Sequence, residues 1–554
     1  MGWPTHFGAI PVSGLNRLRA VVMRTGFTTV GIVAAAATGM AQQQAFTDRD
    51  ASAIEYWHTP YEAAASCAAV LALSGPEFTL LTSVERTLEG GAVAFCKVDG
   101  IIEPEIRFQV DLPERWNGRL YMHGNGGNGG TPADDPRRFR LTVNALEQGF
   151  AVVYSNSGHD ATEEPGITFA YRNPVKKADW GFRATHLSAM AAKDILAFFY
   201  QRPSDYDYFD GCSWGGHQGF AMAQRFPDLF DGIVAGSPVF DFTGVHFNHR
   251  KVYGAFHPDW PVQEETDILA EAILDKCDAV DGLSDGVVQH PRMCEFDPVA
   301  DLPGCDAGQD TGQCMSPERR EAFASIYEPV VTAAGEVLAP GRPASGEIKG
   351  FMPSPGDGGY AIRDAWAGTL TPRRPDGEPF ILSRLTDAVK VYLFAPDDLE
   401  RSWLDFDLDR DWQSVMAQAD WLDETDPDLG PYRESGGKMI VYHGWADYNI
   451  NPNLTYEYFE DVHAVMGRPA ADDTARLFMV PGMYHCGGGH DVFEFDGMTP
   501  LINWVEGGEA PERIEFSANE HFNPGRERPV CAFPATARYR GGDPDRPESF
   551  ECVE

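Results

Sequence analysis

Basic residues are scarce in this chain. Lysine and arginine together number 44 among 554 residues, against 83 aspartate and glutamate residues, and the formal net charge at pH 7 is -39. A protein that binds nucleic acid needs a cationic face, so we expect no nucleic-acid partner. The acidic residues are dispersed along the chain and are not gathered in one tail, a distribution that indicates a solvated acidic surface and not an interaction patch.

The chain also lacks long apolar runs, and its most apolar stretch is a short one near the N-terminus. After Met23, Arg24 supplies a positive charge, residues 26–37 form a mostly apolar run, and residues 39–41 offer small residues for cleavage. This run is shorter than the ~20 apolar residues of a membrane span. We therefore predict a signal peptide over residues 1–41, with either a true start at Met23 or an unusually long leading segment. The mature protein is expected to be secreted or periplasmic, with no membrane contact.

No C-x-x-C pair occurs among the ten cysteines, so a zinc or thioredoxin-like site has little support. In an exported protein an even number of cysteines predicts disulfides, here five. The sequence alone does not fix their pairing. Proximity favours Cys67–Cys96, Cys277–Cys294, Cys305–Cys314 and Cys531–Cys552, which leaves Cys212 with Cys486.

Short apolar runs alternate with helical patterns in two separate parts of the chain. This alternation predicts a doubly wound, mostly parallel sheet with helices on both faces. Strands are expected at residues 119–123, 150–154, 206–211, 232–236, 438–442 and 477–480, and helices at 186–199 and 219–225. Between them lies a proline-rich, acidic segment with isolated helices at 264–276 and 317–326. We predict a catalytic domain from residues 42–241 and 435–554, and an inserted lid domain over residues 242–434.

Residues 211–216 (GCSWGG) follow an expected strand and precede an expected helix. Gly211, Ser213 and Gly215 satisfy the pattern G-x-S-x-G, in which small neighbours permit a sharp turn that lifts a serine out of the sheet. The alternative is an ordinary glycine-rich turn. With the flanking strand and helix taken into account, the pattern favours Ser213 as a nucleophile.

A serine hydroxyl needs a histidine to take its proton and a carboxylate to orient that histidine. Asp447 and His485 each follow an expected strand, in the chain order Ser, acid, His that such hydrolases use. His443 is a rival base, but it precedes the acid, so a structural role suits it better. Cys212 and Cys486 adjoin the predicted nucleophile and base, and a hydrogen bond between these two would bring the cysteines within disulfide range.

The tetrahedral intermediate of acyl transfer needs two N–H donors. The backbone of Trp214, just after the serine, supplies one by position. The glycine-rich loop at 124–130 follows an early strand, where the second donor normally arises, and Gly127 is preferred to Gly126. Taken alone, this loop is equally well explained as a flexible turn.

Residues 277–287 (CDAVDGLSDGV) place three carboxylates at intervals of three and four residues, interspersed with glycine. Such oxygen-rich loops suit a hard cation, and calcium is the natural ion outside the cell. Asp278, Asp281 and Asp285 are predicted ligands through their carboxylates, and Leu283 and Val287 through their backbone carbonyls. A simple acidic turn is the alternative. The ion would be structural, because the loop belongs to the insertion.

These motifs together resemble the tannase and feruloyl esterase family, which includes the mono(2-hydroxyethyl) terephthalate hydrolases. The likeness covers most of the mature chain and is carried by residues 116–127 (WNGRLYMHGNGG), 211–238, 277–288 (CDAVDGLSDGVV), 436–447 (GGKMIVYHGWAD), 477–486 (LFMVPGMYHC) and 501–512. It implies an α/β-hydrolase core with a lid, a Cys212–Cys486 disulfide and a structural calcium ion. It also implies that Ser213, His485 and Asp447 form the catalytic triad.

The resemblance implies hydrolysis of small aromatic esters through an acyl-enzyme, without an organic cofactor. Feruloyl- or galloyl-type esters are the leading expectation, and a terephthalate half-ester is the alternative. Arg384, Arg401 and Phe380 are candidates for contacts with such a half-ester, by neighbourhood alone. Less favoured alternatives are a serine peptidase on the same core and a non-catalytic, calcium-stabilised binding protein.

Overall fold

The structure is a computed structural model of the chain. It describes residues 45–554 apart from 47–48, 76, 89–90, 92, 133–134, 306–312, 354–359, 364–365, 373–376, 491–492, 495 and 519–524. The signal peptide predicted for residues 1–41 lies outside the described residues. Thr38–Glu554 forms one compact unit. No helix in the described part is long and apolar enough to cross a membrane.

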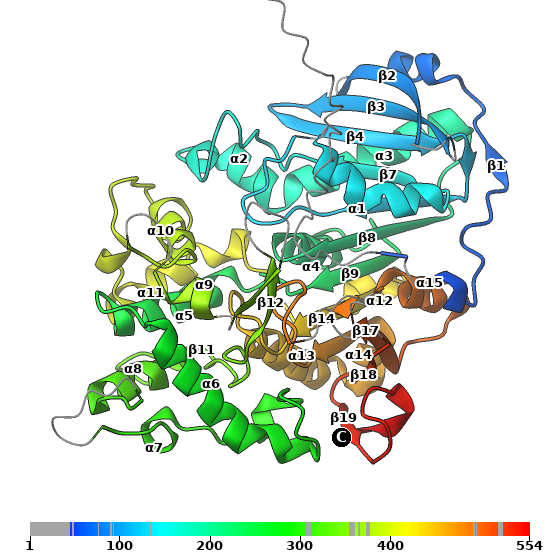
Figure 1. Cartoon of the computed structure of the whole chain (residues 1–554). Helices are drawn as coiled ribbons and strands as arrows, with labels where there is room; N and C mark the ends of the chain where they lie inside the picture. Colours follow the sequence, from blue (N-terminus) through cyan, green and yellow to red (C-terminus); the bar gives the residue numbers. More distant parts are fainter. Residues whose placement is uncertain are drawn as a thin grey trace, which may run out of the picture. The chain divides into compact units, whose positions relative to one another are not determined.

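A nine-stranded sheet forms the centre of this unit (Figure 1). Its order is β15 (Ala475–Val480), β14 (Lys438–Gly444), β9 (Gly232–Gly236), β8 (Tyr206–Cys212), β6 (Arg119–His123), β7 (Ala151–Ser155), β4 (Ile106–Pro113), β3 (Ala94–Ile102) and β2 (Thr79–Thr87). Strands β15 to β7 run parallel to one another. β4, β3 and β2 add an antiparallel edge. The six strands expected from apolar runs all belong to the parallel part, because such strands are buried on both faces.

Successive residues of each strand face opposite sides of the sheet, and the core is divided accordingly. In β14, Met439 and Val441 join the larger apolar cluster, whereas Ile440 and Tyr442 join the smaller one. The larger cluster is covered by α3 (Ala184–Tyr200), α4 (Trp214–Arg225) and α13 (Pro452–Met466). The smaller one is covered by α1 (Pro136–Glu147) and α15 (Met498–Gly507). The predicted α/β-hydrolase fold class, a mostly parallel sheet with helices on both faces, is thus confirmed.

All strands of the main sheet come from residues 79–236 and 438–480, and the segment between them has its own elements (Figure 1). They are α5 (Phe242–Phe256), α6 (Gln263–Cys277), α7 (Pro298–Asp301), α8 (Pro317–Tyr327), α9 (Trp366–Thr369), α10 (Leu382–Val391), α11 (Leu408–Met416) and α12 (Gly430–Glu434), with the hairpins β10 (Val330–Val331)–β11 (Val337–Ala339) and β12 (Gly350–Pro353)–β13 (Tyr360–Arg363). Helix α5 packs against α8, α10 and α11. The division into a catalytic domain and a lid remains a prediction.

Smaller elements complete the described chain. They are α2 (Pro174–Ala178), α14 (Arg468–Thr474), the pair β1 (Tyr61–Glu62)–β5 (Arg115–Trp116), the sheet β16 (Phe493–Glu494)–β17 (Arg513–Ala518)–β18 (Glu527–Cys531) and the hairpin β19 (Thr536–Tyr539)–β20 (Phe550–Val553). All ten cysteines are paired, in the four pairs that sequence proximity favoured and in the pair Cys212–Cys486 that was left over. Disulfides persist in oxidising compartments, so these bridges indicate an environment outside the cytoplasm.

Candidate active site

Ser213 occupies a strained turn between β8 and α4. Its φ of 64° and ψ of -118° lie outside the regions that a residue with a side chain ordinarily adopts. The turn is possible because the neighbouring glycines let the backbone segments touch. A Cβ on Gly211 would lie 2.8 Å from the backbone of Gly215, and one on Gly216 would lie 2.6 Å from the carbonyl oxygen of Gly236. The glycines of the motif are therefore a packing requirement of the turn.

Three side chains distant in sequence form a continuous hydrogen-bonded chain at this turn. Nε2 of His485 lies 2.9 Å from Oγ of Ser213, and Nδ1 of His485 lies 2.7 Å from Oδ2 of Asp447. Asp447 follows β14 and His485 follows β15, two adjacent parallel strands whose carboxyl ends meet at one edge of the sheet. The structure thus brings together the predicted nucleophile, base and acid in the arrangement required for general-base activation of a serine.

The carboxylate of Asp447 is buried and fully engaged. Its Oδ1 accepts the backbone N–H groups of Asn449 (2.8 Å) and Ile450 (3.0 Å). Its Oδ2 lies 3.2 Å from Nε2 of His443 as well as 2.7 Å from His485. Burial acts to raise the pKa of Asp447, but the neighbouring His485 and the hydrogen bonds from both histidines outweigh it and hold the pKa well below its ordinary value. Asp447 is therefore ionised at neutral pH.

The insertion also reaches the loop that carries this acid. Arg342 is buried, and its guanidinium donates to the backbone carbonyl oxygens of Asp447 (3.2 Å) and Asn449 (3.1 Å). Burial lowers the pKa of Arg342, against the opposing attraction of Asp447. The side-chain amide of Asn451 meanwhile donates to the carbonyl oxygen of Pro340 (2.9 Å), two residues before Arg342. Residues 340–342 of the insertion are thus hydrogen-bonded to the loop at 447–451 that carries Asp447.

The two candidate oxyanion donors belong to the start of α4 and to the glycine-rich loop after β6. Trp214 begins α4, where a backbone N–H has no intrahelical partner and the helix dipole favours negative charge. Gly127 has a φ of 57°, a conformation that favours glycine. Its loop is anchored to α4, because Oε1 of Gln218 accepts the backbone N–H of Asn125 at 2.9 Å. The open space around Gly126 leaves access to this loop.

Four aromatic rings form a stack beside the two donor segments. Trp180 lies 3.6 Å from Trp214 between ring centroids, nearly parallel to it, and Trp214 lies 3.9 Å from His217. Tyr392, the residue directly after α10 of the insertion, stacks on Trp180 at 4.7 Å between ring centroids. The indole N–H of Trp180 also points at the carbonyl oxygen of Gly127, at 3.4 Å. The stack therefore connects the glycine-rich loop, the start of α4 and a helix of the insertion.

The Cys212–Cys486 disulfide joins the residue before Ser213 to the residue after His485, with a Cα–Cα distance of 5.9 Å. These cysteines are 274 residues apart in sequence. The bridge therefore fixes the nucleophile turn covalently to the base loop.

In the predicted calcium loop, the charges of Asp278 and Asp285 act on Asp281. Burial, followed by the neighbouring charges of Asp285 and Asp278, raises the pKa of Asp281 to about 6. Asp278 accepts backbone N–H groups from Asp285 and Gly286, and Asp285 is paired with Arg528 at 2.7 Å. The described residues contain no cluster of three or more metal-ligating side chains. The oxygen donor set fits a hard cation only when backbone carbonyls, such as those of Leu283 and Val287, complete it.

The three lid residues considered for substrate contact differ in position. A Cβ placed on Gly127 would lie 3.5 Å from Nη2 of Arg384, so this guanidinium faces the glycine-rich loop. Within the described part of the chain it has no hydrogen-bond or ion-pair partner. Arg401 instead donates to Val389 and lies over Phe394, and the Phe380 side chain is exposed. Only Arg384 approaches the site.

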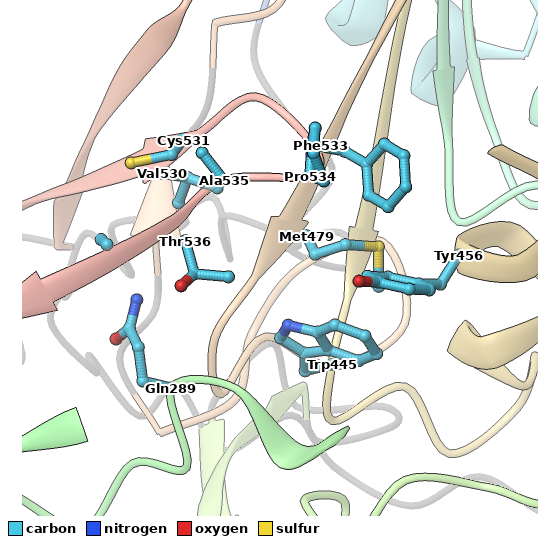
Figure 2. A pocket seen from close by; sticks show the side chains of 11 residues that line it. Gln289, Trp445, Tyr456, Met479, Val530, Cys531, Phe533, Pro534, Ala535 and Thr536 are labelled. Carbon is cyan, nitrogen blue, oxygen red and sulfur yellow. The ribbon is translucent and has the colours of Figure 1, made fainter. Parts of the chain in front are cut away.

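A small cavity lies apart from the triad, between the loop after β14 and the C-terminal segment. Figure 2 shows its aromatic floor, formed by Trp445, Tyr456 and Phe533, with Met479 between them. Its volume of about 20 Å³ suits a single water molecule. Neither Ser213 nor His485 lines it, so it is not the substrate site.

Several contributors to the site had not been expected from the sequence. Gln218, Trp180 and Arg342 act through contacts with residues distant in the chain, and no local pattern marks them. For His443 the sequence favoured a structural role over that of a rival base, but it did not indicate the contact with Asp447 that the structure contains.

The sheet, the serine turn and the hydrogen-bonded chain define the class as an α/β-hydrolase with a serine-centred site. Comparison with known proteins gives the family. The protein family described as "Tannase and feruloyl esterase" matches residues 91–553 of this chain. The chain belongs to this family and is a carboxylic ester hydrolase.

Individual relatives agree with this assignment. A mono(2-hydroxyethyl) terephthalate hydrolase of Piscinibacter sakaiensis is 31% identical over 525 residues, covering 83% of this chain and 84% of its own. A probable feruloyl esterase B-2 of Aspergillus terreus is 28% identical over 480 residues, covering 81% and 83%. Among solved structures, feruloyl esterase B from Aspergillus oryzae superposes with a TM-score of 0.75 at 24% identity, over 88% of this chain and all of its own. The last likeness supports the fold.

Replacing both Cys212 and Cys486 by serine should lower both melting temperature and kcat. The bridge restrains an unusually long loop in the unfolded chain, for which a loss of about 2–4 kcal/mol is expected, and it also fixes Ser213 relative to His485. Thermal melts and ester turnover on the same sample measure the two effects. The matched control removes Cys305–Cys314, whose cysteines are only 9 residues apart. Equal losses of kcat in both double variants would contradict a role for the bridge in the site.

Proposed function

We propose that this protein is an exported serine carboxylester hydrolase that cleaves feruloyl- or galloyl-type esters of aromatic acids. The observation that carries the proposal is the Ser213–His485–Asp447 hydrogen-bonded chain beside two candidate oxyanion donors. The proposal that the substrate is an ester of an aromatic acid rests on the family, whose description names tannase and feruloyl esterase.

In this proposal His485 takes the proton of Ser213 as Oγ attacks the ester carbonyl. The backbone N–H groups of Gly127 and Trp214 stabilise the oxyanion of the tetrahedral intermediate. His485 then protonates the departing alcohol, and an acyl-enzyme remains on Ser213. Water, deprotonated by His485, attacks the acyl carbonyl and releases the acid, while Asp447 keeps the imidazole oriented throughout.

An ester panel tests mechanism and substrate class together. Purified mature protein should hydrolyse methyl ferulate or methyl gallate with a higher kcat/KM than a short aliphatic p-nitrophenyl ester. Ser213→Ala should reduce each rate by at least ~1,000-fold, because no nucleophile remains. Turnover is measured by product chromatography, with thermal melts to confirm folding. Unchanged hydrolysis by Ser213→Ala would refute the nucleophile assignment, and a preference for the aliphatic ester would refute the substrate class.

A terephthalate half-ester is the second candidate substrate, and one observation favours it. The guanidinium of Arg384 faces the glycine-rich loop without a partner among the described residues. A half-ester of an aromatic diacid carries a free carboxylate, for which a planar guanidinium is a suitable bidentate partner. The 31% identity to a mono(2-hydroxyethyl) terephthalate hydrolase agrees with this alternative.

Replacing Arg384 by glutamine distinguishes the two substrates. If the site accepts the half-ester, its KM should rise about 10-fold or more, the effect of one lost hydrogen bond to a charged group. The KM for neutral methyl ferulate should change by less than about 2-fold. Arg401→Gln is the matched control, since Arg401 packs on Phe394. A parallel rise in both KM values would show that Arg384 is not selective for the anionic substrate.

We also propose that a structural calcium ion is held by Asp278, Asp281 and Asp285 with the backbone carbonyls of Leu283 and Val287. Burial and the neighbouring charges of Asp285 and Asp278 raise the pKa of Asp281, and a bound cation would offset both effects, which supports a cation in this loop. The predicted signal peptide and the five disulfides support export to the periplasm or the medium, where calcium is abundant.

Chelation of calcium should lower the melting temperature without changing kcat at low temperature. A ligand at 100 times its dissociation constant stabilises the fold by about 2.7 kcal/mol, and removal reverses this. Scanning calorimetry in EDTA, then after re-addition of calcium, measures the effect. Asp281→Asn should melt at the same temperature with and without calcium. A wild-type melting temperature that is unaffected by EDTA, in protein freed of metal, would exclude the site.

A further inference from the structure

His443 lies directly behind the carboxylate of Asp447. It belongs to β14, on the face that packs against α13, and it is fully buried. Its Nε2 lies 3.2 Å from Oδ2 of Asp447, the same oxygen that His485 contacts at 2.7 Å. Its Nδ1 lies 2.8 Å from Oγ1 of Thr455, a buried residue of α13. Two imidazoles therefore share one oxygen of the acid.

The chemistry of these partners assigns the protons. An ionised carboxylate only accepts hydrogen bonds, so Nε2 of His443 carries a proton and donates it to Oδ2. Nδ1 of a neutral imidazole then accepts, and the hydroxyl of Thr455 is its donor. Thr455 thus selects the tautomer in which His443 can serve Asp447. With two backbone N–H groups on Oδ1 and two imidazoles on Oδ2, the carboxylate has all of its lone pairs engaged.

We propose that His443 is a positioning residue for the esterase site. Its Nε2–H holds Oδ2 of Asp447 in place and moderates the attraction of that oxygen for His485. This inference rests on the proposed role of Ser213, Asp447 and His485 as the triad. It does not depend on which ester is the natural substrate.

A carboxylate that donates less electron density to His485 makes that imidazole a weaker base. Removal of the His443 hydrogen bond would leave Asp447 more basic and would stabilise the protonated form of His485. The other charged and titratable groups that face Asp447 are Arg342, Tyr442 and Tyr448. They remain in every variant, so a change in the pH profile reports on His443.

The test compares His443→Leu with His443→Gln, in which the side-chain amide can place a donor near the position of Nε2. His443→Leu should lose about 10- to 100-fold in kcat/KM, as expected for one hydrogen bond to a charged group. The acid limb of its pH profile should move upward by about half a unit. His443→Gln should stay within about 3-fold of wild type with an unshifted limb. The matched control is His463→Gln, because His463 of α13 is paired with Asp472 of α14 and does not contact Asp447.

A short p-nitrophenyl ester is the assay substrate, with Ser213→Ala as the background, so failure of the aromatic substrate proposal leaves this test intact. A folded His443→Leu protein with wild-type kcat/KM and an unshifted acid limb would overturn the inference. If that variant does not fold, nitrogen-15 NMR of histidine-labelled wild type decides the matter. A neutral His443 protonated on Nε2 is expected, and a proton on Nδ1 would overturn the proposal.

Discussion

The backbone of Ser213 adopts a conformation that its side chain disfavours, and the rest of the site depends on how the fold sustains that strain. The turn persists because β8, α4 and the end of β9 approach one another at glycines, where any Cβ would collide with backbone. The serine is thereby presented at the carboxyl edge of the parallel sheet. The same edge receives the loops after β14 and β15, so the acid and base arrive beside it as a consequence of strand order.

The carboxylate of Asp447 is the electrostatic centre of the site. It is buried, yet four donors hold it ionised, and two of them come from its own loop. A buried charge is stable only when it is fully hydrogen-bonded, so each donor limits how far the loop can move. Arg342 extends this restraint to the insertion by holding two carbonyl groups of the same loop. The insertion therefore supports the acid in addition to any role in substrate selection.

The oxyanion region has a second support that is mainly apolar. The stack of Tyr392, Trp180, Trp214 and His217 joins a helix of the insertion to the start of α4. Trp180, Trp214 and His217 are buried, so the stack removes a large apolar area from water. Burial lowers the pKa of His217 to about 3, so this ring stays neutral within the stack. The two candidate oxyanion donor segments are thus held by packing as well as by hydrogen bonds.

The sequence by itself determined the class of fold, the strands of the parallel sheet and the identity of Ser213, Asp447 and His485 as candidates. These features are local: buried strands read as apolar runs, the serine turn needs glycines at fixed spacing, and the acid and base follow strands in a fixed order. Cysteine proximity also favoured four of the five disulfides that the structure contains, which left Cys212 and Cys486 as the fifth pair. Only the tertiary structure decided which side chains support the site, because their contacts join residues that are not neighbours in sequence. These side chains are Gln218, Trp180, Arg342 and Thr455. The sequence favoured a structural role for His443, but its contact with Asp447 was decided by the tertiary structure, in which its ring lies between Asp447 and Thr455 of α13.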